Sequence, residues 1–154
     1  MHKQGFTLIE LLLVIAIIAI LVVSVFAALN PAQRFKDARN ARRSTDVETL
    51  LTAIHESIID TRGSLPSGMS SGMAETQLGT AGSGCAIATA GCNATPSACL
   101  NLTTPLAAYL KSMPVDPSLA TNSATTQYSV VVDSNGIITV RACGAEGTTI
   151  ATSR

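Results

Sequence analysis

Apolar residues dominate the first 29 positions of the chain, where the only fully charged residues are Lys3 and Glu10. Leu11 to Val23 is an unbroken apolar run, and the 24 positions from Phe6 to Leu29 include only three polar residues. A helix of that length rises about 36 Å, which is enough to cross a hydrocarbon core of about 30 Å. The bilayer core offers no water to hydrogen-bond the backbone, so backbone groups there must pair within their own segment, as they do in a helix. The pattern therefore predicts a transmembrane helix over residues 6–29.

A different pattern follows over residues 30–62, which carry eleven charged residues. Apolar residues recur there at helical spacing, on Val47, Leu50, Leu51, Ile54 and Ile58. They predict an amphipathic helix with one apolar face. Asn30-Pro31 predicts a kink or a break between the two helices, because proline removes a backbone hydrogen bond and Asn30 can cap a new helix.

The charges and the end of this second helix lead to three expectations. Gly63 is expected to terminate the helix as its C′ residue. We expect local ion pairs among Arg39, Arg42, Arg43 and Asp46. The basic group at 34–43 is interpreted as a solvated face with salt bridges to other copies of the chain, with DNA or phospholipid head groups as the alternative ligands. The balance of 10 Lys+Arg against 10 Asp+Glu argues against a generally basic nucleic-acid binder.

The remaining residues divide into a loop region and a small head. Residues 63–104 hold seven Gly and twelve Ser or Thr but a single charged residue, Glu75, and predict a loop-rich connection. In residues 105–154, strands at 128–132 and 137–140 flank Asn135-Gly136, which predicts a β-hairpin. We also expect a short helix over 102–111 and an edge strand at 148–151. The predicted fold class is α+β, a long N-terminal helix packed on a small antiparallel sheet.

Four cysteines, all after residue 84, indicate disulfides that stabilise this small head. Four cysteines allow three connectivities. We favour Cys85–Cys92 as a local bridge and Cys99–Cys143 across the head. The triplets at 93–95 and 101–103 match the N-glycosylation pattern, and Ser/Thr glycosylation is an equal alternative.

Catalytic and metal chemistry find little support in the sequence. It contains no Ser-His-Asp, Cys-His, paired-carboxylate or phosphate-loop arrangement, so we expect neither an enzyme nor a cofactor. The two His residues lie far from the cysteines and CxxC pairs are absent, which argues against zinc. Asp116 and Asp133 are the only acids in residues 105–140, too few for the carboxylate set that calcium favours. With no Trp, two Tyr and three Phe, the chain also offers few stacking platforms for nucleic acid.

Glu10 is the anomaly in the apolar segment, because an ionisable residue in a membrane span is costly and functional by default. Residues 11–33 contain no Lys or Arg. A cationic partner must therefore come from Lys3, from a free N-terminus or from another molecule; the simpler alternative is that Glu10 sits at the head-group level.

The segment from Lys3 to Leu11, with Gly5 before Phe6 and Glu10 five residues into the mature chain, resembles the class III leader of type IV pilins and type II secretion pseudopilins. The resemblance implies that a prepilin peptidase cuts between Gly5 and Phe6 and N-methylates Phe6. It also implies that Glu10 pairs with the terminal amine of the neighbouring subunit during assembly, with Thr7 assisting. The Pro114-Val115-Asp116-Pro117 run is similar to the Pro-x-Asp-Pro region of major pseudopilins.

This resemblance implies a domain order along the chain: a leader at 1–5, a transmembrane and filament-core helix at 6–29, an amphipathic helix at 30–62, a loop region at 63–104 and a head at 105–154. The implied partners are identical subunits in a helical filament, prepilin peptidase, membrane lipid before assembly and a pilus assembly platform. The implied location is the inner membrane as a single-pass protein, then an extracellular filament or a periplasmic pseudopilus.

Two alternatives use the same apolar segment differently. An ordinary secretory signal peptide, cleaved after Val25-Phe26-Ala27, implies a secreted binding protein, but Glu10 and the length of the apolar stretch argue against it. A plain anchor helix is the other. The basic group at 34–43 exceeds the basic residues before the span, which by the positive-inside rule places the C-terminus inside. The resemblance implies the opposite orientation, and we follow it because it rests on several matched residues.

We therefore expect a structural subunit of a type IV pilus-like filament, with a pseudopilin of a type II secretion system as the alternative. The disulfides of the head favour an exposed pilus, whereas the Pro-Val-Asp-Pro run favours a relative of the pseudopilins.

Overall fold

The computed structural model describes residues 5–118 and 122–154. Most of the leader, including Lys3, lies outside the described residues. The chain divides into two compact units, Met1–Asp37 and Ala38–Arg154, and each is described by itself.

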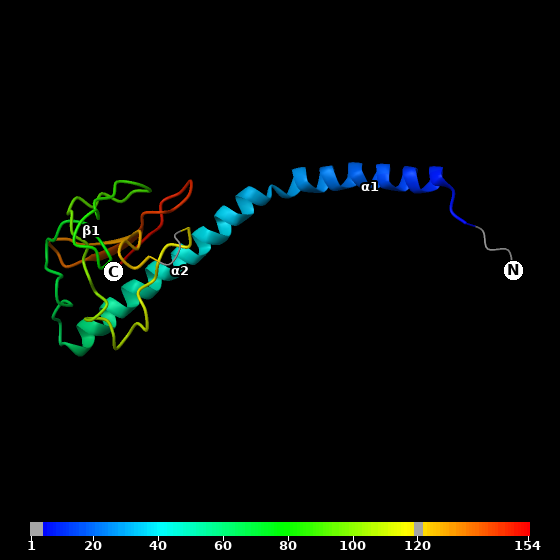
Figure 1. The fold of residues 1–154 in the computed structure, drawn as a ribbon. Helices are drawn as coiled ribbons and strands as arrows, with labels where there is room; N and C mark the ends of the chain where they lie inside the picture. Colours follow the sequence, from blue (N-terminus) through cyan, green and yellow to red (C-terminus); the bar gives the residue numbers. More distant parts are fainter. Residues whose placement is uncertain (1–4, 119–121) are drawn as a thin grey trace. The chain divides into compact units, whose positions relative to one another are not determined.

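Two helices meet at Asn30, in the first unit (Figure 1). α1 runs over Leu8–Leu29 and ends at Asn30, whose left-handed backbone (φ 39°) stops the helix. α2 runs over Pro31–Asp60, and the carbonyl of Asn30 accepts hydrogen bonds from the amides of Gln33 and Arg34 at its start. Pro31 is tolerated as the first helical residue because no intrahelical acceptor is available there for an amide. The break predicted at Asn30-Pro31 is confirmed.

In the second unit, α2 closes with a different residue from the one expected. Arg62 has the left-handed conformation (φ 59°) and its amide donates to the carbonyl of Ile59 at 3.1 Å. The amide of Gly63 donates to the carbonyl of Ile58 at 2.8 Å. These two bonds form a Schellman motif in which Arg62 is C′ and Gly63 is C″. The expectation that Gly63 is the C′ residue was therefore wrong by one position, because Gly63 is C″. Its φ of 98° nonetheless favours glycine.

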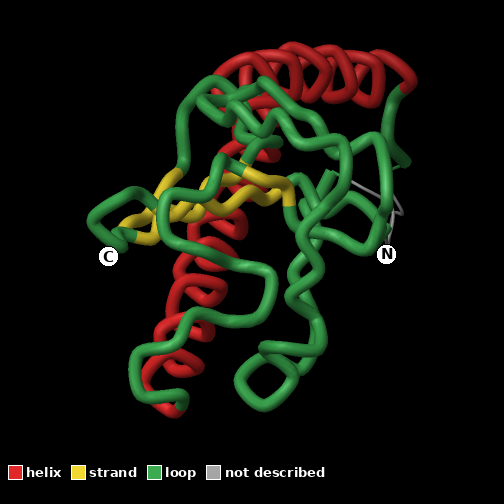
Figure 2. The backbone as a smooth tube through the Cα atoms, turned by 90° about the vertical axis from the view of Figure 1, so that its left-hand side faces the viewer, coloured by secondary structure: helices red, strands yellow, loops and turns green. Residues whose placement is uncertain are grey.

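A four-stranded antiparallel sheet packs against α2 (Figures 1 and 2). Its strands are β1 (Thr76–Gln77), β2 (Tyr128–Val132), β3 (Ile138–Ala142) and β4 (Ala151–Ser153), in that order across the sheet. β2 and β3 form the predicted hairpin, with Val130 opposite Val140. β4 lies later than the edge strand expected at 148–151. β1 falls in the stretch that was expected to hold only loops.

The helix predicted over 102–111 is wrong. The structure has turns there, in which separate hydrogen bonds run from Leu106 to Leu102 and from Leu110 to Leu106. Asn101 favours a turn at the start, because its side chain accepts from the amide of Thr103 at 3.0 Å. Leu102 and Leu106 are nonetheless fully buried in the core. The spacing of these apolar residues therefore reflects their packing in the core and does not indicate a helix.

The core of the second unit joins the stripe of α2 to the sheet. Val47, Leu50 and Ile54 are at most 1% exposed and belong to one cluster with the inward side chains of β2 and β3. Burial of such side chains is the main stabilising contribution available to a small unit. The predicted amphipathic stripe is therefore confirmed as the face that packs on the head.

Candidate functional site

The segment that precedes α1 is exposed. Gly5, Phe6 and Thr7 precede α1 and are not helical. The side chain of Phe6 is 92% exposed, and a Cβ built on Gly5 meets no atom within 4 Å.

Thr7 and Glu10 form a capping box at the start of α1. The Thr7 amide and the Thr7 hydroxyl each donate to the Glu10 carboxylate at 2.8 Å. In return, the Glu10 amide donates to the Thr7 hydroxyl oxygen at 3.3 Å. The Thr-x-x-Glu spacing is a known signature of such caps, so this arrangement was readable from the sequence and was missed there. The cap fixes the Glu10 carboxylate beside the positive end of the helix dipole.

The carboxylate of Glu10 has no cationic partner among residues 5–118 and 122–154, where all ion pairs lie in the second unit. Apart from Ser24, the rest of α1 is apolar, and its described side chains are all exposed. By length and composition, this helix is able to cross a membrane. Glu10 is therefore a charged group at one end of an unpartnered apolar helix, free to meet a cation from outside the described residues.

A buried ionic cluster holds the head on α2. The guanidinium of Arg43 donates two hydrogen bonds to Asp116, at 2.7 and 2.9 Å, and a third to Glu146 at 3.1 Å. Arg39 donates two more to Glu146, at 2.6 and 2.7 Å. The expectation of local pairing was wrong for Arg39 and Arg43, whose partners lie more than 70 residues away; it holds only for Arg42 and Asp46, at 3.8 Å. Arg43 is buried against the head and Arg39 is partly buried there, which brings both within reach of the acids of the head.

Electrostatics in this cluster favour the ionised forms. Hydrogen bonds from Arg39 and Arg43 lower the pKa of Glu146 to about 2. Burial would raise the pKa of Asp116, but hydrogen bonds from Arg43 and Ser118 outweigh it and the pKa is lowered. The carboxylate oxygens of Asp116 thus accept hydrogen bonds from Arg43 and Ser118. The carboxylate of Asp133 likewise accepts hydrogen bonds from the backbone amides of Asn135 and Ile137.

Both disulfides form, but with a pairing different from the one predicted. The bonds are Cys85–Cys99 and Cys92–Cys143, so Cys85–Cys92 and Cys99–Cys143 were wrong. The physical reason is that Cys92 lies against the sheet beside Ser129 of β2, next to the end of β3 where Cys143 follows. Cys85, Cys92 and Cys99 follow one another at intervals of seven residues, and this spacing carried no information about which cysteines the fold brings together.

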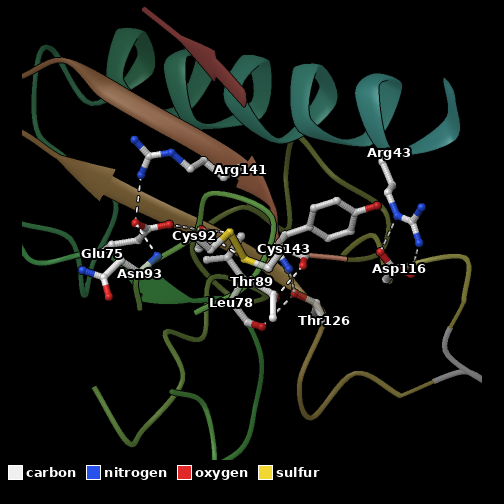
Figure 3. Close-up of a disulfide and its surroundings, with 12 residues drawn as sticks. Arg43, Glu75, Leu78, Thr89, Cys92, Asn93, Asp116, Thr126, Arg141 and Cys143 are labelled. Carbon is white, nitrogen blue, oxygen red and sulfur yellow. Dashed lines mark hydrogen bonds and ion pairs between the residues drawn. A yellow bond between two sulfur atoms is a disulfide. The ribbon is translucent and has the colours of Figure 1, made fainter. Parts of the chain in front are cut away.

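Figure 3 shows the surroundings of Cys92–Cys143. The carboxylate of Glu75 accepts from the guanidinium of Arg141 at 2.8 Å and from the amide of Asn93 at 3.0 Å. The Thr89 hydroxyl donates to the carbonyl of Cys143 at 2.7 Å. The loop region is thereby attached to the sheet at several points. Asn93 and Asn101, the two glycosylation candidates, are exposed.

Comparison with known proteins finds one match, at the N-terminus. Residues 1–26 match the family model described as the prokaryotic N-terminal methylation motif. The chain carries a class III prepilin leader of the type IV pilin and pseudopilin kind. No curated protein and no solved structure matches the chain.

The prepilin leader and the fold agree with each other. A long N-terminal helical region over residues 8–60 followed by a four-stranded antiparallel sheet is the α+β arrangement expected of a pilin. The leader and the apolar α1 fit a membrane-anchored precursor. The motif points to a structural protein of the pilin or pseudopilin type.

Proposed function

We propose that the chain is the structural subunit of a type IV pilus-like filament, inserted in the membrane through α1 and then polymerised through the same helix. The observation that carries this proposal is a capped carboxylate, Glu10, at the start of an exposed apolar helix that follows a prepilin leader. Lipid covers the apolar side chains before assembly, and other copies of α1 cover them afterwards.

Processing supplies a cation for Glu10, which has no cationic partner among the residues that the structure describes. Hydrolysis of the Gly5–Phe6 peptide bond by a prepilin peptidase creates an amine on Phe6, which N-methylation leaves cationic. The Thr7 cap orients the Glu10 carboxylate, and the Phe6 amine of an adjacent subunit neutralises it. A carboxylate transferred with a matching ammonium costs much less free energy than one transferred alone.

A second candidate, a pseudopilin of a type II secretion system, is favoured by the Pro114–Pro117 segment. Its Asp116 accepts the two hydrogen bonds from Arg43 that fix this segment on α2. Two disulfides in the head support exposure outside the cytosol, because the reducing cytosol keeps cysteine thiols from pairing.

Intact-mass measurement of the chain purified from its native membrane tests the proposal. The expected mass is that of a chain starting at N-methyl-Phe6. A start at residue 28 indicates an ordinary signal peptide and overturns the proposal. The neighbouring genes then separate the two candidates: a retraction ATPase indicates a pilus, and a secretin with secretion components indicates a pseudopilus.

A further inference from the structure

The start of α2, residues 31–37, is an uncovered stretch that directly follows the apolar α1 in the first unit. Every residue of the stretch is exposed, and the Phe35 side chain is 66% exposed. Arg34 and Lys36 form no ion pair with any residue that the structure describes. The stretch therefore offers an aromatic ring and two cations to a partner from outside the described chain.

The other charged groups nearby are already engaged. Arg39, Arg42 and Arg43 each lie 3.8 Å or less from a carboxylate of the second unit. The carboxylate of Asp37 accepts a hydrogen bond from the side-chain amide of Gln33 at 2.8 Å. Of the basic group at 34–43, Arg34 and Lys36 are thus the two cations left for an external anion.

These two cations lie on opposite flanks of the helix. Successive residues of an α-helix are turned by about 100°, so Phe35 points midway between Arg34 and Lys36. The cations therefore stand at the two borders between an apolar arc and a polar arc of the helix surface. The apolar arc holds Pro31, Ala32 and Phe35, and the polar arc holds Gln33 and Asp37.

This arrangement fits a flat anionic layer better than a pocket. A pocket on another protein needs both cations on one face of the helix, which their opposed positions do not allow. At a bilayer surface, an apolar arc enters the boundary of the acyl chains, and cations at its two borders extend to phosphate groups on either side. The opposed flanks of Arg34 and Lys36 therefore favour lipid head groups as the partner.

The distance from the apolar helix agrees with that depth. The 22 residues of α1 rise about 33 Å, close to the hydrocarbon core of about 30 Å. Lys36 follows the last residue of α1 by at most about 11 Å of helix, so its side chain reaches the head-group layer when α1 spans the membrane. The left-handed Asn30 ends α1, so the axis of α2 does not have to follow the axis of α1.

We propose that residues 31–37 bind anionic phospholipid head groups at the bilayer surface, with Phe35 at the acyl boundary and Arg34 and Lys36 on phosphates. The proposal rests on the proposed function, because it requires α1 to span the membrane, and it names the lipid class that the inserted subunit contacts. Since α1 has a fixed length, a contact that holds one end at the surface also sets the depth of Glu10 at the other end.

A single tryptophan tests the contact in the full-length chain. The sequence contains no Trp, so Phe35→Trp introduces one fluorescent reporter. The protein is placed in vesicles of phosphatidylcholine, or of equal parts phosphatidylcholine and phosphatidylglycerol, in which some lipid carries bromine near the head-group end of its acyl chains. Bromine quenches indole fluorescence on contact. Quenching is expected to be at least about twofold greater in the mixed vesicles, because an anionic surface attracts each nearby cation.

Charge variants identify the groups responsible. Arg34→Gln with Lys36→Gln, added to the reporter chain, is expected to reduce quenching in the mixed vesicles to the value in phosphatidylcholine, and high salt acts in the same direction. Lys111→Gln with Arg154→Gln removes two exposed cations from the second unit, and this matched control is expected to leave quenching unchanged. Ile59→Trp, near the end of α2 and 74% exposed, is the reporter control and is expected to be little quenched in either vesicle.

Three results overturn the proposal. The first is equal quenching of the Phe35→Trp chain in the two kinds of vesicle. The second is a lipid response that persists when Arg34 and Lys36 are neutralised, or that is also lost in the Lys111/Arg154 control. The third is a reporter that neither brominated lipid nor the soluble quencher acrylamide reaches, because protein then covers Phe35.

Failure of the proposed function is detected separately with Ile18→Trp, midway along α1, where the side chain is 52% exposed. If lipid brominated deep in its acyl chains quenches this reporter while the Phe35→Trp chain stays unquenched, α1 spans the membrane and only the lipid contact is overturned. If neither reporter is quenched, α1 is not inserted, and the proposed function fails together with the contact that rests on it.

Discussion

Arg43 and Asp116 form a two-bonded ion pair whose side chains are both 0% exposed. The pair joins α2 to the Pro114–Pro117 segment, 73 residues away in sequence. Glu146, from the loop between β3 and β4, accepts a further bond from the same guanidinium. Three distant parts of the chain therefore meet at one arginine.

Removing one partner of this pair is expected to destabilise the second unit strongly. Arg43→Ala leaves the Asp116 carboxylate buried and unpaired, which costs about 3–5 kcal/mol in such cases. Arg42→Ala is the matched control, since Arg42 is 65% exposed and lies 3.8 Å from Asp46; exposed pairs contribute at most about 1 kcal/mol. Denaturant unfolding of the two variants measures the difference. Equal midpoints contradict a structural role for the buried pair.

Gly144 lies so close to this cluster that a side chain does not fit. A Cβ built on Gly144 overlaps the Asp116 carboxylate, although Gly144 does not have a left-handed backbone. Gly144→Ala must push Asp116 away from Arg43, and overpacking of this kind costs about 1–3 kcal/mol. Gly82→Ala is the control, because its Cβ meets nothing within 4 Å. Thermal unfolding should show a lower midpoint for the Gly144 variant alone.

Acid is expected to weaken the head through Glu146. Its pKa falls from an ordinary value of about 4.5 to about 2 in the folded chain. The unfolded chain therefore binds the proton first, so the stabilisation by Glu146 is fully present above about pH 4.5 and is lost as the pH falls toward 2. Glu146→Gln should be less stable than wild type at neutral pH, and the two should converge near pH 2. A constant difference at every pH contradicts this assignment. Asp116 keeps its own acid dependence in both chains.

The two disulfides are expected to contribute unequally. Cys92–Cys143 spans 51 residues and Cys85–Cys99 spans 14. Loop-closure entropy assigns about 4 kcal/mol to the longer bridge and about 3 kcal/mol to the shorter one. Paired serine variants compared by denaturant unfolding test the order. Peptide mapping of the oxidised chain tests the pairing itself, and a Cys85–Cys92 peptide or two alkylatable thiols in the unfolded, unreduced chain contradict the structure.

Local signals predicted much of this fold. The apolar run, the Asn30-Pro31 break, the stripe from Val47 to Ile54 and the Asn135-Gly136 hairpin all depend on residues within a few positions of each other. The disulfide pairing and the partners of Arg39 and Arg43 depend on which distant segments the core brings together. Spacing alone does not contain that information.

Two errors had local causes. The turns after Asn101 bury Leu102 and Leu106 at a spacing of four without forming a helix, so the pattern was indistinguishable from a helical one. β1 is only two residues long, and Thr76 and Gln77 owe their strand geometry to pairing with Val130 and Ser129. Its Gly- and Ser-rich surroundings gave no sign of that pairing.

Substitutions at Glu10 distinguish a capping role from a role in pairing between subunits. Glu10→Ala removes both the acceptor of the two Thr7 hydrogen bonds and the negative charge. Glu10→Gln keeps an oxygen that can accept from Thr7 and removes only the charge. Thr7→Ala removes the hydroxyl and leaves the carboxylate. All three should leave membrane insertion, leader cleavage and head folding intact, because the contacts they change lie outside the head.

The expected order of filament yield follows from the charge. If Glu10 binds the Phe6 amine of a neighbour, both Glu10→Ala and Glu10→Gln lose the ion pair and assemble poorly, whereas Thr7→Ala keeps it and assembles in part. If Glu10 only caps α1, Glu10→Gln assembles like wild type and Thr7→Ala is as defective as Glu10→Ala, since loss of a cap costs about 1 kcal/mol in either case. Electron microscopy of sheared surface fractions, with immunoblots of the membrane pool, separates the two patterns. Normal yield from both Glu10 variants shows that Glu10 is an interfacial residue without a part in assembly.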